Sequence, residues 1–322
     1  MAGGLVEHAA EELITPPAER ATRVRDGRTR ARQAADASAR LRVPLVTAFA
    51  DAYPDRLREI ADPPVVLWVR GVLSVLATPA VAVVGSRQAT ASGLAMARQL
   101  GRELAAAGLT VVSGLARGID AAAHRGALDA GGVTIAVLGC GIDVIYPREH
   151  ADMAAEIPVR GALVTEHLPG TPPLPPYFPL RNRIISGLSL AVVVVEASER
   201  SGSLITARLA LEQGRDVLAV PGPVMPGRHR GCHALIKDGA RVVETVRDVL
   251  EEVGWTALAP GSTAKPLNIN GLEVDIRPGE ALTADALAER MGRPVAEILA
   301  ALTRLELAGS VARTPGGAFL RT

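Results

Sequence analysis

Short apolar runs alternate with amphipathic segments through the middle of the chain. The apolar runs, which we predict to be strands, lie at 81–85, 109–112, 133–139, 161–165, 190–195, 216–220 and 240–243. The predicted helices between them cover 92–107, 119–130, 148–156, 181–188, 203–213, 232–237 and 245–253. Continuous apolar strands separated by amphipathic helices are typical of a parallel sheet covered on both faces. We therefore expect an α/β fold with a Rossmann-like, doubly wound, mostly parallel sheet over residues 79–253.

The flanking segments follow other patterns. Residues 1–43 are rich in Arg and Ala with few large apolar side chains, which predicts a poorly defined N-terminal arm. Residues 44–78 contain two extended pieces around a short helix and are expected to pack on the core as a lead-in segment. A linker is predicted at 254–269. Over 270–322, the order helix, turn, helix and hairpin is typical of a C-terminal winged-helix domain.

Charge and composition narrow the classes of function. The 322 residues carry a formal net charge of only +1, which argues against a protein that coats nucleic acid with a wholly basic surface. The basic residues are 33 arginines and two lysines, and a guanidinium can bind a phosphate through two hydrogen bonds. Aromatic residues make up 2%, so a long platform for stacking bases is excluded.

The chain shows no sign of export or of membrane insertion. The first residues, MAGGLVEHAAEEL, lack the basic and apolar regions of a signal peptide, and runs such as 191–195 are too short to cross a bilayer. With two cysteines, Cys140 and Cys232, a disulfide framework and a four-cysteine zinc site are both excluded by count. We expect a cytoplasmic protein.

Polar residues with one shared chemistry follow four of the predicted strands. Ligands of parallel sheets bind at the carboxyl ends of strands, where loops lead into helix N-termini. The first loop is 85–87, the second 113–120, the third 178–183 and the fourth 201–206. The candidate binding residues are Gly85, Ser86, Arg87, Phe178, Arg181, Asn182, Arg183, Ser201, Gly202 and Ser203, with Gly114, Arg117 and Thr206 as further possibilities. Arginine side chains and helix N-terminal amides both bind phosphate oxygens, so the loops predict a site for a phosphate chain.

Parts of these loops have structural explanations as well. The second loop is equally compatible with a tight strand-to-helix turn in which Asp120 caps the helix, and Ser203 is a predicted N-cap. The segment before the third loop, 169–179, is expected to be neither helix nor central strand, because seven of its eleven residues are Pro or Gly. The third loop is then expected to begin a helix at Arg181.

Sequence signatures of cofactor binding and catalysis are absent. There is no GxGxxG fingerprint, which argues against a nicotinamide cofactor, and no GxxxxGK[ST] loop, which argues against ATP. The histidines have no metal-ligand spacing, and no GxSxG or SxxK motif accompanies the serines. Glu166 and Glu196 end strands and are expected to bond to nearby amides. We predict no cofactor, no metal and no catalytic turnover.

A set of ordered motifs is similar to one known family. GSR (85–87), SGLARGID (113–120), FPLRNRIISGLS (178–189), the stretch 194–222 and LIKDGA (235–240) resemble the DprA family of DNA-processing proteins, also called Smf. The likeness covers about 44–322. It implies a protein that binds single-stranded DNA, protects incoming DNA and loads the RecA recombinase during natural transformation. It also implies a homodimer formed through the Rossmann-like domain, without a known cofactor.

The resemblance assigns roles to individual residues. Its DNA contacts fall on the ten candidates given above for the first, third and fourth loops. Arg87, Arg181 and Arg183 would neutralise phosphates and Phe178 would stack on a base, which gives a slope of log affinity against log salt of about −2. The chain also departs from the family, because Ser198 and His233 stand where many relatives have lysine and asparagine, respectively.

Two other classes of function remain open. One is a Rossmann-fold enzyme that hydrolyses nucleotides, although the PGGxGTxxE signature of such enzymes is replaced here by VPGPVMPG. The other is a regulator that binds duplex DNA through the winged helix. The predicted recognition helix, 294–308, has Arg304 as its one basic residue beside Glu297 and Glu306, a composition that suits the major groove poorly.

Overall fold

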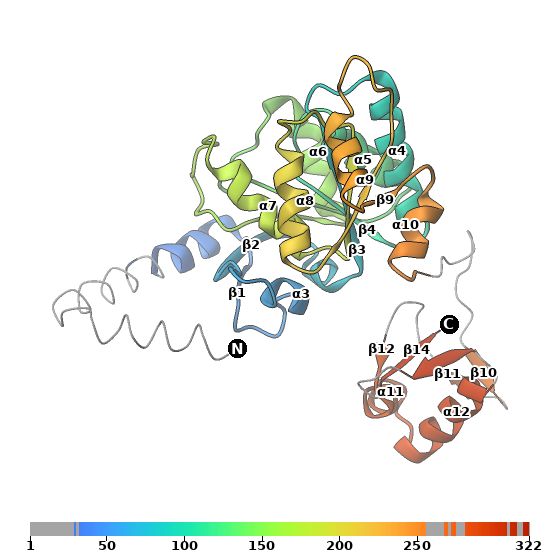
Figure 1. The fold of residues 1–322 in the computed structure, drawn as a ribbon. Coiled ribbons are helices and arrows are strands. Elements are labelled where there is room, and N and C mark those ends of the chain that lie inside the picture. Colours follow the sequence, from blue (N-terminus) through green and yellow to red (C-terminus); the bar gives the residue numbers. More distant parts are fainter. Residues whose placement is uncertain are drawn as a thin grey trace, which may run out of the picture.

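A nine-stranded sheet forms the centre of the molecule (Figure 1). The computed structural model describes residues 29, 32–255, 267–269, 272–274, 281–307, 310–313 and 318–321. The strands of this sheet are β1 (Leu45–Thr47), β2 (Val66–Gly71), β3 (Ala80–Gly85), β4 (Thr110–Ser113), β5 (Thr134–Val137), β6 (Ala162–Thr165), β7 (Ala191–Val195), β8 (Asp216–Ala219) and β9 (Arg241–Val242). Their order is β1-β2-β6-β5-β4-β3-β7-β8-β9. The strands from β6 to β9 in this order are parallel, whereas β1 and β2 pair antiparallel, so the predicted, mostly parallel α/β sheet is confirmed.

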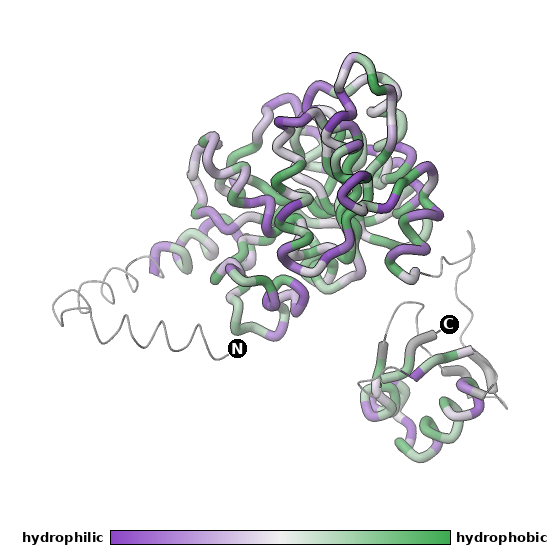
Figure 2. Tube along the Cα trace, in the orientation of Figure 1, coloured by the Kyte–Doolittle hydropathy of each residue, from purple (hydrophilic) through white to green (hydrophobic). Residues whose placement is uncertain are grey.

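Helices cover both faces of this sheet. They are α3 (Asp55–Arg58), α4 (Ala91–Ala106), α5 (Ile119–Asp129), α6 (Ala151–Glu156), α7 (Tyr177–Gly187), α8 (Ser203–Glu212), α9 (Arg230–Lys237) and α10 (Val246–Glu252). Successive residues of a strand point to opposite faces. In β7, Val192 and Val194 pack with α7 and α8, while Val193 packs with α4 and α5. Figure 2 shows the resulting concentration of hydrophobic residues in the central strands.

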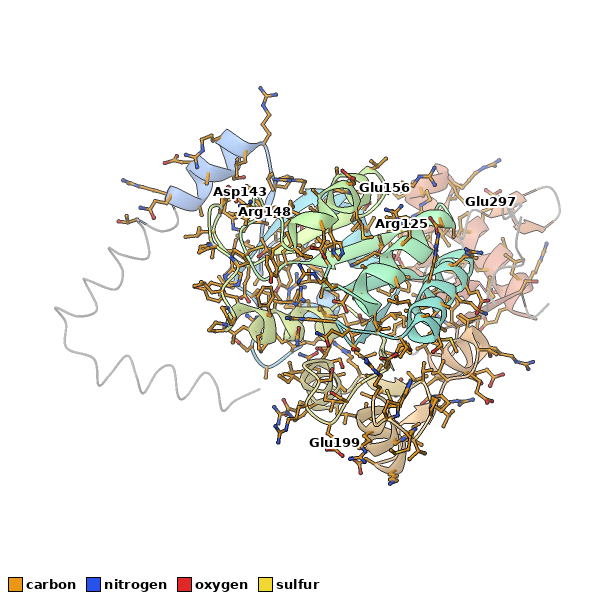
Figure 3. All side chains as sticks on the ribbon, turned by 90° about the horizontal axis from the view of Figure 1, so that it is seen from above. Arg125, Asp143, Arg148, Glu156, Glu199 and Glu297 are labelled. Carbon is orange, nitrogen blue, oxygen red and sulfur yellow. The ribbon has the colours of Figure 1, made fainter. Side chains whose placement is uncertain are left out.

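Polar contacts tie the outer helices to one another. Arg125 of α5 forms an ion pair with Glu156 of α6 at 2.8 Å, and Figure 3 shows the two labelled side chains close together. Arg98 of α4 binds Asp129 at the end of α5. Such exposed pairs contribute little to stability individually, so the apolar faces of the helices hold the layers together.

The sheet begins earlier in the chain than the pattern of apolar runs predicts. The lead-in segment supplies β1 and β2, which extend the sheet beyond β6 rather than only packing against it. Residues 32–41 of the predicted arm are helical, and Ala34, Ala37 and Val43 are buried in a cluster with Trp68 and Ile142. Small alanine side chains allow this close approach, which a search for large apolar residues does not detect. Most of the remaining arm lies outside the described residues.

Two helix starts differ from the predictions. Helix α7 begins at Tyr177 rather than at Arg181, so Phe178 and Pro179 lie in its first turn. Proline is tolerated there because the first backbone N–H groups of a helix have no partner within the helix. Gly202, not Ser203, is the N-cap of α8, and Ser203 is the first helical residue.

The C-terminal part has the helices and strands expected of a winged helix. Its elements are β10 (Leu267–Ile269), β11 (Leu272–Val274), β12 (Ala281–Leu282), α11 (Ala284–Met291), α12 (Val295–Leu307), β13 (Val311–Arg313) and β14 (Phe319–Arg321). The Thr283 hydroxyl caps α11 by accepting the Ala286 N–H at 3.2 Å. Leu302 of α12 packs in the same core as Phe319 of β14. The turn of the predicted hairpin and most of the predicted linker lie outside the described residues.

Candidate functional site

A cleft of about 620 Å³ opens at the carboxyl ends of the parallel strands. All four predicted loops contribute to its lining, which supports the prediction that the loops following the strands meet at one edge of the sheet. The lining contains Gly85, Ser86, Arg87 and Gln88 from the first loop, Ala116 and Asp120 from the second, Phe178, Pro179, Arg181 and Asn182 from the third, and Ser201, Gly202, Ser203, Ile205 and Thr206 from the fourth. Ser198, Tyr146, Pro173 and Pro175 complete the walls.

An arginine and two aromatic rings form one wall of the cleft. The guanidinium carbon of Arg87 lies over the Phe178 ring, 5.3 Å from its centroid. On the same ring, Tyr146 packs at a centroid distance of 5.4 Å with a tilt of 39°. Arg87 is exposed, and no carboxylate of the described residues forms an ion pair with it. The wall thus combines an exposed cation that has no ion-pair partner among the described residues with two aromatic rings.

The backbone of the first loop is fixed on both sides. The Ser86 N–H donates to the Glu196 carbonyl oxygen at 2.8 Å, and the Ser86 carbonyl oxygen accepts the N–H of Ile119 at 3.1 Å. The Ser86 hydroxyl oxygen accepts the Gln88 N–H at 3.1 Å, which leaves the hydroxyl proton for another acceptor. The loop that bears Arg87 is therefore held between β7 and the start of α5.

Arg181 lies at the floor of the cleft, and its guanidinium stabilises the fold. Its Nη1 donates to the carbonyl oxygens of Gly114, at 2.7 Å, and Val137. Only 3% of Arg181 is exposed, and burial lowers the pKa of its guanidinium to about 10. A Cβ on Gly114 would lie 2.1 Å from Arg181 Nη2, so the glycine makes room for the guanidinium. The Arg181 Nε donates to Asn182 Oδ1 at 3.1 Å, so Nε and Nη1 of this predicted phosphate ligand are occupied within the protein, while the residue still lines the cleft.

The second loop is held by its own carboxylate. The Asp120 carboxylate accepts the N–H groups of Gly114 at 3.0 Å and Ala116 at 3.4 Å, so it holds the loop, whereas the predicted helix cap is wrong because Gly118 is the N-cap of α5 and Asp120 lies in the first turn. Burial raises the pKa of Asp120, while nearby Arg181 and these N–H groups act in the opposite direction. Two of the loop amides thus already have a carboxyl oxygen as their acceptor. Arg117 points elsewhere and binds Glu149 through both side-chain oxygens, at 2.6 and 2.7 Å.

Arg183 is engaged in an ion pair and does not line the cleft. Its Nη1 and Nη2 donate to the two Glu166 oxygens at 2.5 and 2.6 Å, and its Nε lies 3.1 Å from an Asp62 carboxylate oxygen. These hydrogen bonds raise the pKa of Arg183. Its side chain is 14% exposed. These contacts connect α7 to the end of β6 and to the lead-in segment. The family resemblance had instead assigned Arg183 to a phosphate.

The fourth loop meets α7 at the base of the cleft. Asn182 Nδ2 donates to the Gly202 carbonyl oxygen at 3.5 Å, and the hydroxyls of Ser201 and Ser203 are 2.7 Å apart. Ser203 and Thr206 are almost fully buried, with 7% and 2% exposed. Hydroxyl groups and the N-terminal turn of α8 therefore line the cleft, where the partial positive charge of the helix start favours an anion.

Tyr146 is an aromatic lining residue that the sequence argument missed. It lies in the loop after β5, which ends at the same edge of the sheet as the four loops considered. The same rule about strand ends would have found it, had a loop without arginine been included. Within the described residues, no three His, Cys, Asp or Glu side chains are grouped so that they could hold a metal ion, and no helix has the length and apolar character required to cross a membrane.

Comparisons with known proteins give one consistent family. Residues 44–254 match the family described as DNA recombination-mediator protein A, and residues 279–317 match the DprA winged helix domain. Protein Smf of Escherichia coli is 45% identical over 284 residues, which cover 85% of this chain and 76% of that protein. DNA processing protein DprA of Streptococcus pneumoniae is 48% identical over 202 residues, covering 63% of this chain and 71% of the relative.

Solved structures agree with the sequence matches. The X-ray structure of the Streptococcus pneumoniae protein superposes with a TM-score of 0.63 at 47% identity, covering 65% of this chain and 74% of that one. DNA processing protein A from Helicobacter pylori, whose structure concerns its mode of binding single-stranded DNA, gives a TM-score of 0.59 at 29% identity over 65% of this chain and 95% of that chain. The chain described here belongs to the DNA recombination-mediator protein A family.

Proposed function

We propose that this chain binds single-stranded DNA in the cleft, protects incoming DNA and loads the RecA recombinase during natural transformation, without catalytic turnover or a cofactor. The observation that carries the proposal is the placement of Arg87 against Phe178 and Tyr146. A guanidinium with no carboxylate partner among the described residues suits a phosphate, and the adjoining rings suit a base. The two groups together match one nucleotide of a strand.

The geometry favours a single strand over a duplex. Bases of a duplex are stacked on one another and present only their edges, so a ring such as Phe178 cannot stack on them. In a single strand each base has a free face, and stacking on an aromatic side chain contributes about 1–3 kcal/mol per base. Backbone N–H groups at the start of α8 and the hydroxyls of Ser201 and Ser203 would bind further phosphate oxygens.

The comparisons support the recombination role. The matching family is described as a recombination mediator, and the Helicobacter pylori relative is described as binding single-stranded DNA. A recombination mediator acts by delivering DNA to a recombinase, which is why RecA is the proposed partner. For both steps the protein must meet DNA and RecA in the same compartment, so we propose a cytoplasmic location.

A homodimer formed through the Rossmann-like domain has a physical purpose in this proposal. Among the described residues, Arg87 is the one arginine of the cleft lining without a hydrogen-bond acceptor, so a single site would bind weakly. Two sites joined on one strand bind more tightly, because the second contact forms at a high effective concentration. Analytical ultracentrifugation of the full chain, with and without an oligonucleotide long enough for two sites, measures this directly.

Fluorescence anisotropy tests the DNA-binding step. An unstructured oligonucleotide and the duplex of the same sequence are titrated with the wild-type chain and with the Arg87→Ala variant over a salt series. We expect tighter binding to the single strand and a loss of affinity in the variant. Equal affinity for the two DNAs, or a variant that binds like the wild type, would contradict the assignment of the cleft.

RecA loading needs a separate measurement. RecA filament growth on a single strand covered by single-strand-binding protein is followed by RecA ATP hydrolysis, with and without this chain. We expect the chain to shorten the delay before hydrolysis begins, and we expect Arg87→Ala to lose the effect. An unchanged delay in the presence of wild-type chain that binds DNA would contradict the loading role alone.

A second candidate function is a nucleotide-hydrolysing enzyme, and Asp120 is the residue that favours testing it. Its carboxyl group lines the cleft, is buried and has a raised pKa, which are properties that enzymes use in acid–base steps. Its hydrogen bonds to the Gly114 and Ala116 amides support a structural role instead. Mass spectrometry of nucleoside monophosphates incubated with the chain decides between them, since release of free base would establish the enzyme.

A further inference from the structure

Glu196 binds both ends of the loop that bears Arg87. It follows β7 directly and is fully buried. Its carbonyl oxygen accepts the Ser86 N–H at 2.8 Å. Its carboxylate accepts the Thr90 N–H, at 3.1 and 2.9 Å to the two oxygens, and the Thr90 hydroxyl at 2.5 Å. One residue therefore fixes the stretch Ser86–Thr90 at its first and last positions.

The backbone of Glu196 adopts an unfavourable conformation to do this. Its φ is 53°, in the left-handed region that costs non-glycine residues free energy. Burying a carboxylate adds a further cost unless hydrogen bonds and positive charge offset it. Here the start of α4 supplies the Thr90 N–H, and Arg228 lies 3.9 Å from the carboxylate. A buried carboxylate on a residue with a left-handed backbone conformation is retained only where the surrounding contacts hold it in place.

Two neighbours complete the arrangement. Arg228 donates from Nη1 to the Gln88 carbonyl oxygen at 2.8 Å, so the loop is also held in its middle. Gly93 lies on the first turn of α4 facing Glu196, and a Cβ at this position would be 2.4 Å from the carboxylate oxygen Oε2. The loop is thus held at residues 86, 88 and 90, and the exposed side chain of Arg87 projects from between these points.

We infer that Glu196 is a positioning residue of the DNA-binding site, which acts by holding the Ser86–Thr90 loop so that Arg87 faces Phe178. The inference rests on the proposed function. Within the described residues, the hydrogen bonds of the carboxylate all go to Thr90, and none goes to a neighbouring strand. A carboxylate that stabilised the sheet would hydrogen-bond to a neighbouring strand, whereas the Glu196 carboxylate hydrogen-bonds to the loop.

The expected size of the effect follows from loop populations. If only a fraction of molecules holds the competent loop, the apparent dissociation constant rises by the inverse of that fraction. If loss of the Glu196 carboxylate reduces the competent fraction to roughly a tenth, DNA binding weakens about tenfold. The same loss has no effect when Arg87 is already absent, because the loop then has no arginine to position.

The test is a double-mutant cycle on the full chain with a single-stranded oligonucleotide as probe. Glu196→Gln and Arg87→Ala are measured singly and together, at a temperature where circular dichroism shows every variant to be folded. Glu199→Gln is the matched control, because Glu199 lies on the same loop after β7 but is exposed and pairs with Arg230 (Figure 3). We expect Glu196→Gln to raise the dissociation constant about tenfold alone and less than twofold beside Arg87→Ala.

If Glu196→Gln does not fold, a second variant tests the same inference. Gly93→Ala adds one methyl group next to the carboxylate, while alanine otherwise favours a helix. We expect weaker DNA binding in a variant that remains folded by circular dichroism, again without effect beside Arg87→Ala. A change of melting temperature with an unchanged dissociation constant would identify Glu196 as purely structural and overturn the inference.

The outcomes separate this inference from the proposed function. If Arg87→Ala binds DNA like the wild type, the proposed function fails. If Arg87→Ala weakens binding and Glu196→Gln does not, or if Glu196→Gln weakens binding equally in both backgrounds, the inference alone fails. A non-additive effect on the dissociation constant, absent from Glu199→Gln, supports both.

Discussion

The guanidinium of Arg87 lies 5.3 Å from the centre of the Phe178 ring, across loops that are far apart in the sequence. Of the three arginines that the sequence assigned to phosphates, Arg87 is the one that lines the cleft with an exposed side chain. Arg181 binds two carbonyl oxygens and Arg183 binds Glu166. The pairing of Arg87 with Phe178 therefore determines what the cleft can bind and which variants are informative.

Replacing Arg87 with alanine should weaken binding to a single strand about tenfold or more at low salt, since hydrogen bonds to charged groups contribute about 1.5–3 kcal/mol. Fluorescence anisotropy over a salt series should also show a slope of log affinity against log salt that is shallower by about 0.7, the value for one phosphate of a single strand. Arg230→Ala is the control, because Arg230 pairs with Glu199 and does not line the cleft. An unchanged slope would contradict the phosphate contact.

Phe178→Leu should weaken binding by roughly fivefold or more, because it removes a ring that stacks on a base and keeps an apolar side chain. Stacking does not release counterions, so the salt slope should stay that of the wild type. Phe49→Leu removes an aromatic side chain that is 91% exposed and outside the cleft, and it should bind normally. A Phe178→Leu variant that changes only the slope would indicate that the ring acts through Arg87 instead of through a base.

Arg183→Ala should lower the stability of the protein rather than its affinity for DNA. The variant leaves Glu166 partly buried without its two hydrogen bonds, a loss of about 2 kcal/mol in the free energy of unfolding. Urea denaturation measures this loss, and anisotropy on the folded variant should give a dissociation constant within about twofold of the wild type. Arg183→Lys keeps the charge but not the paired geometry and should fall between the two. A large loss of affinity at unchanged stability would return Arg183 to the binding site.

Stability should fall below pH 6.5 through His124. Its Nδ1 donates to the Thr134 hydroxyl oxygen at 2.7 Å, because that hydroxyl donates to the Val111 carbonyl oxygen. Its Nε2 is buried with no partner among the described residues, so a second proton has no acceptor. Burial lowers the pKa of His124 from 6.5 to about 3.

The unfolded chain therefore binds a proton at this site below pH 6.5 while the folded chain does not. The contribution to stability is complete above that pH and falls by about 1.4 kcal/mol per pH unit toward pH 3. Urea denaturation at several pH values should show a shallower dependence for His124→Asn, whose amide can still donate to Thr134. Identical dependence in both proteins would show that His124 is protonated in the folded state.

The pattern of apolar runs was sufficient to predict the central sheet. Runs such as 191–195 are buried on both faces, so every residue is apolar and the strand is obvious. The edge of the sheet was harder to predict, because β1 has three residues and β2 contains Arg70. The helix at 32–41 packs through alanines, whose burial leaves little trace in a hydropathy pattern.

The position of the site was predictable, but the state of its arginines was not. Strand ends and loop glycines indicated the edge of the sheet at which the cleft opens, and the resemblance to the DprA family was confirmed by the family match. Whether an arginine is free depends on a partner that no local pattern marks. Arg183 meets Glu166 across 17 residues, and Arg181 meets a carbonyl group across 67.

The buried position of Arg181 has a consequence for the time at which the cleft forms during synthesis. Its guanidinium closes contacts with residues 67 and 44 positions earlier, so the floor of the cleft is incomplete until α7 has left the ribosome. Contacts of such long range form late in folding. A nascent or truncated chain that ends before this helix already contains Arg87 but has no cleft in which to present it. Incomplete chains are therefore expected not to compete with the finished protein for DNA.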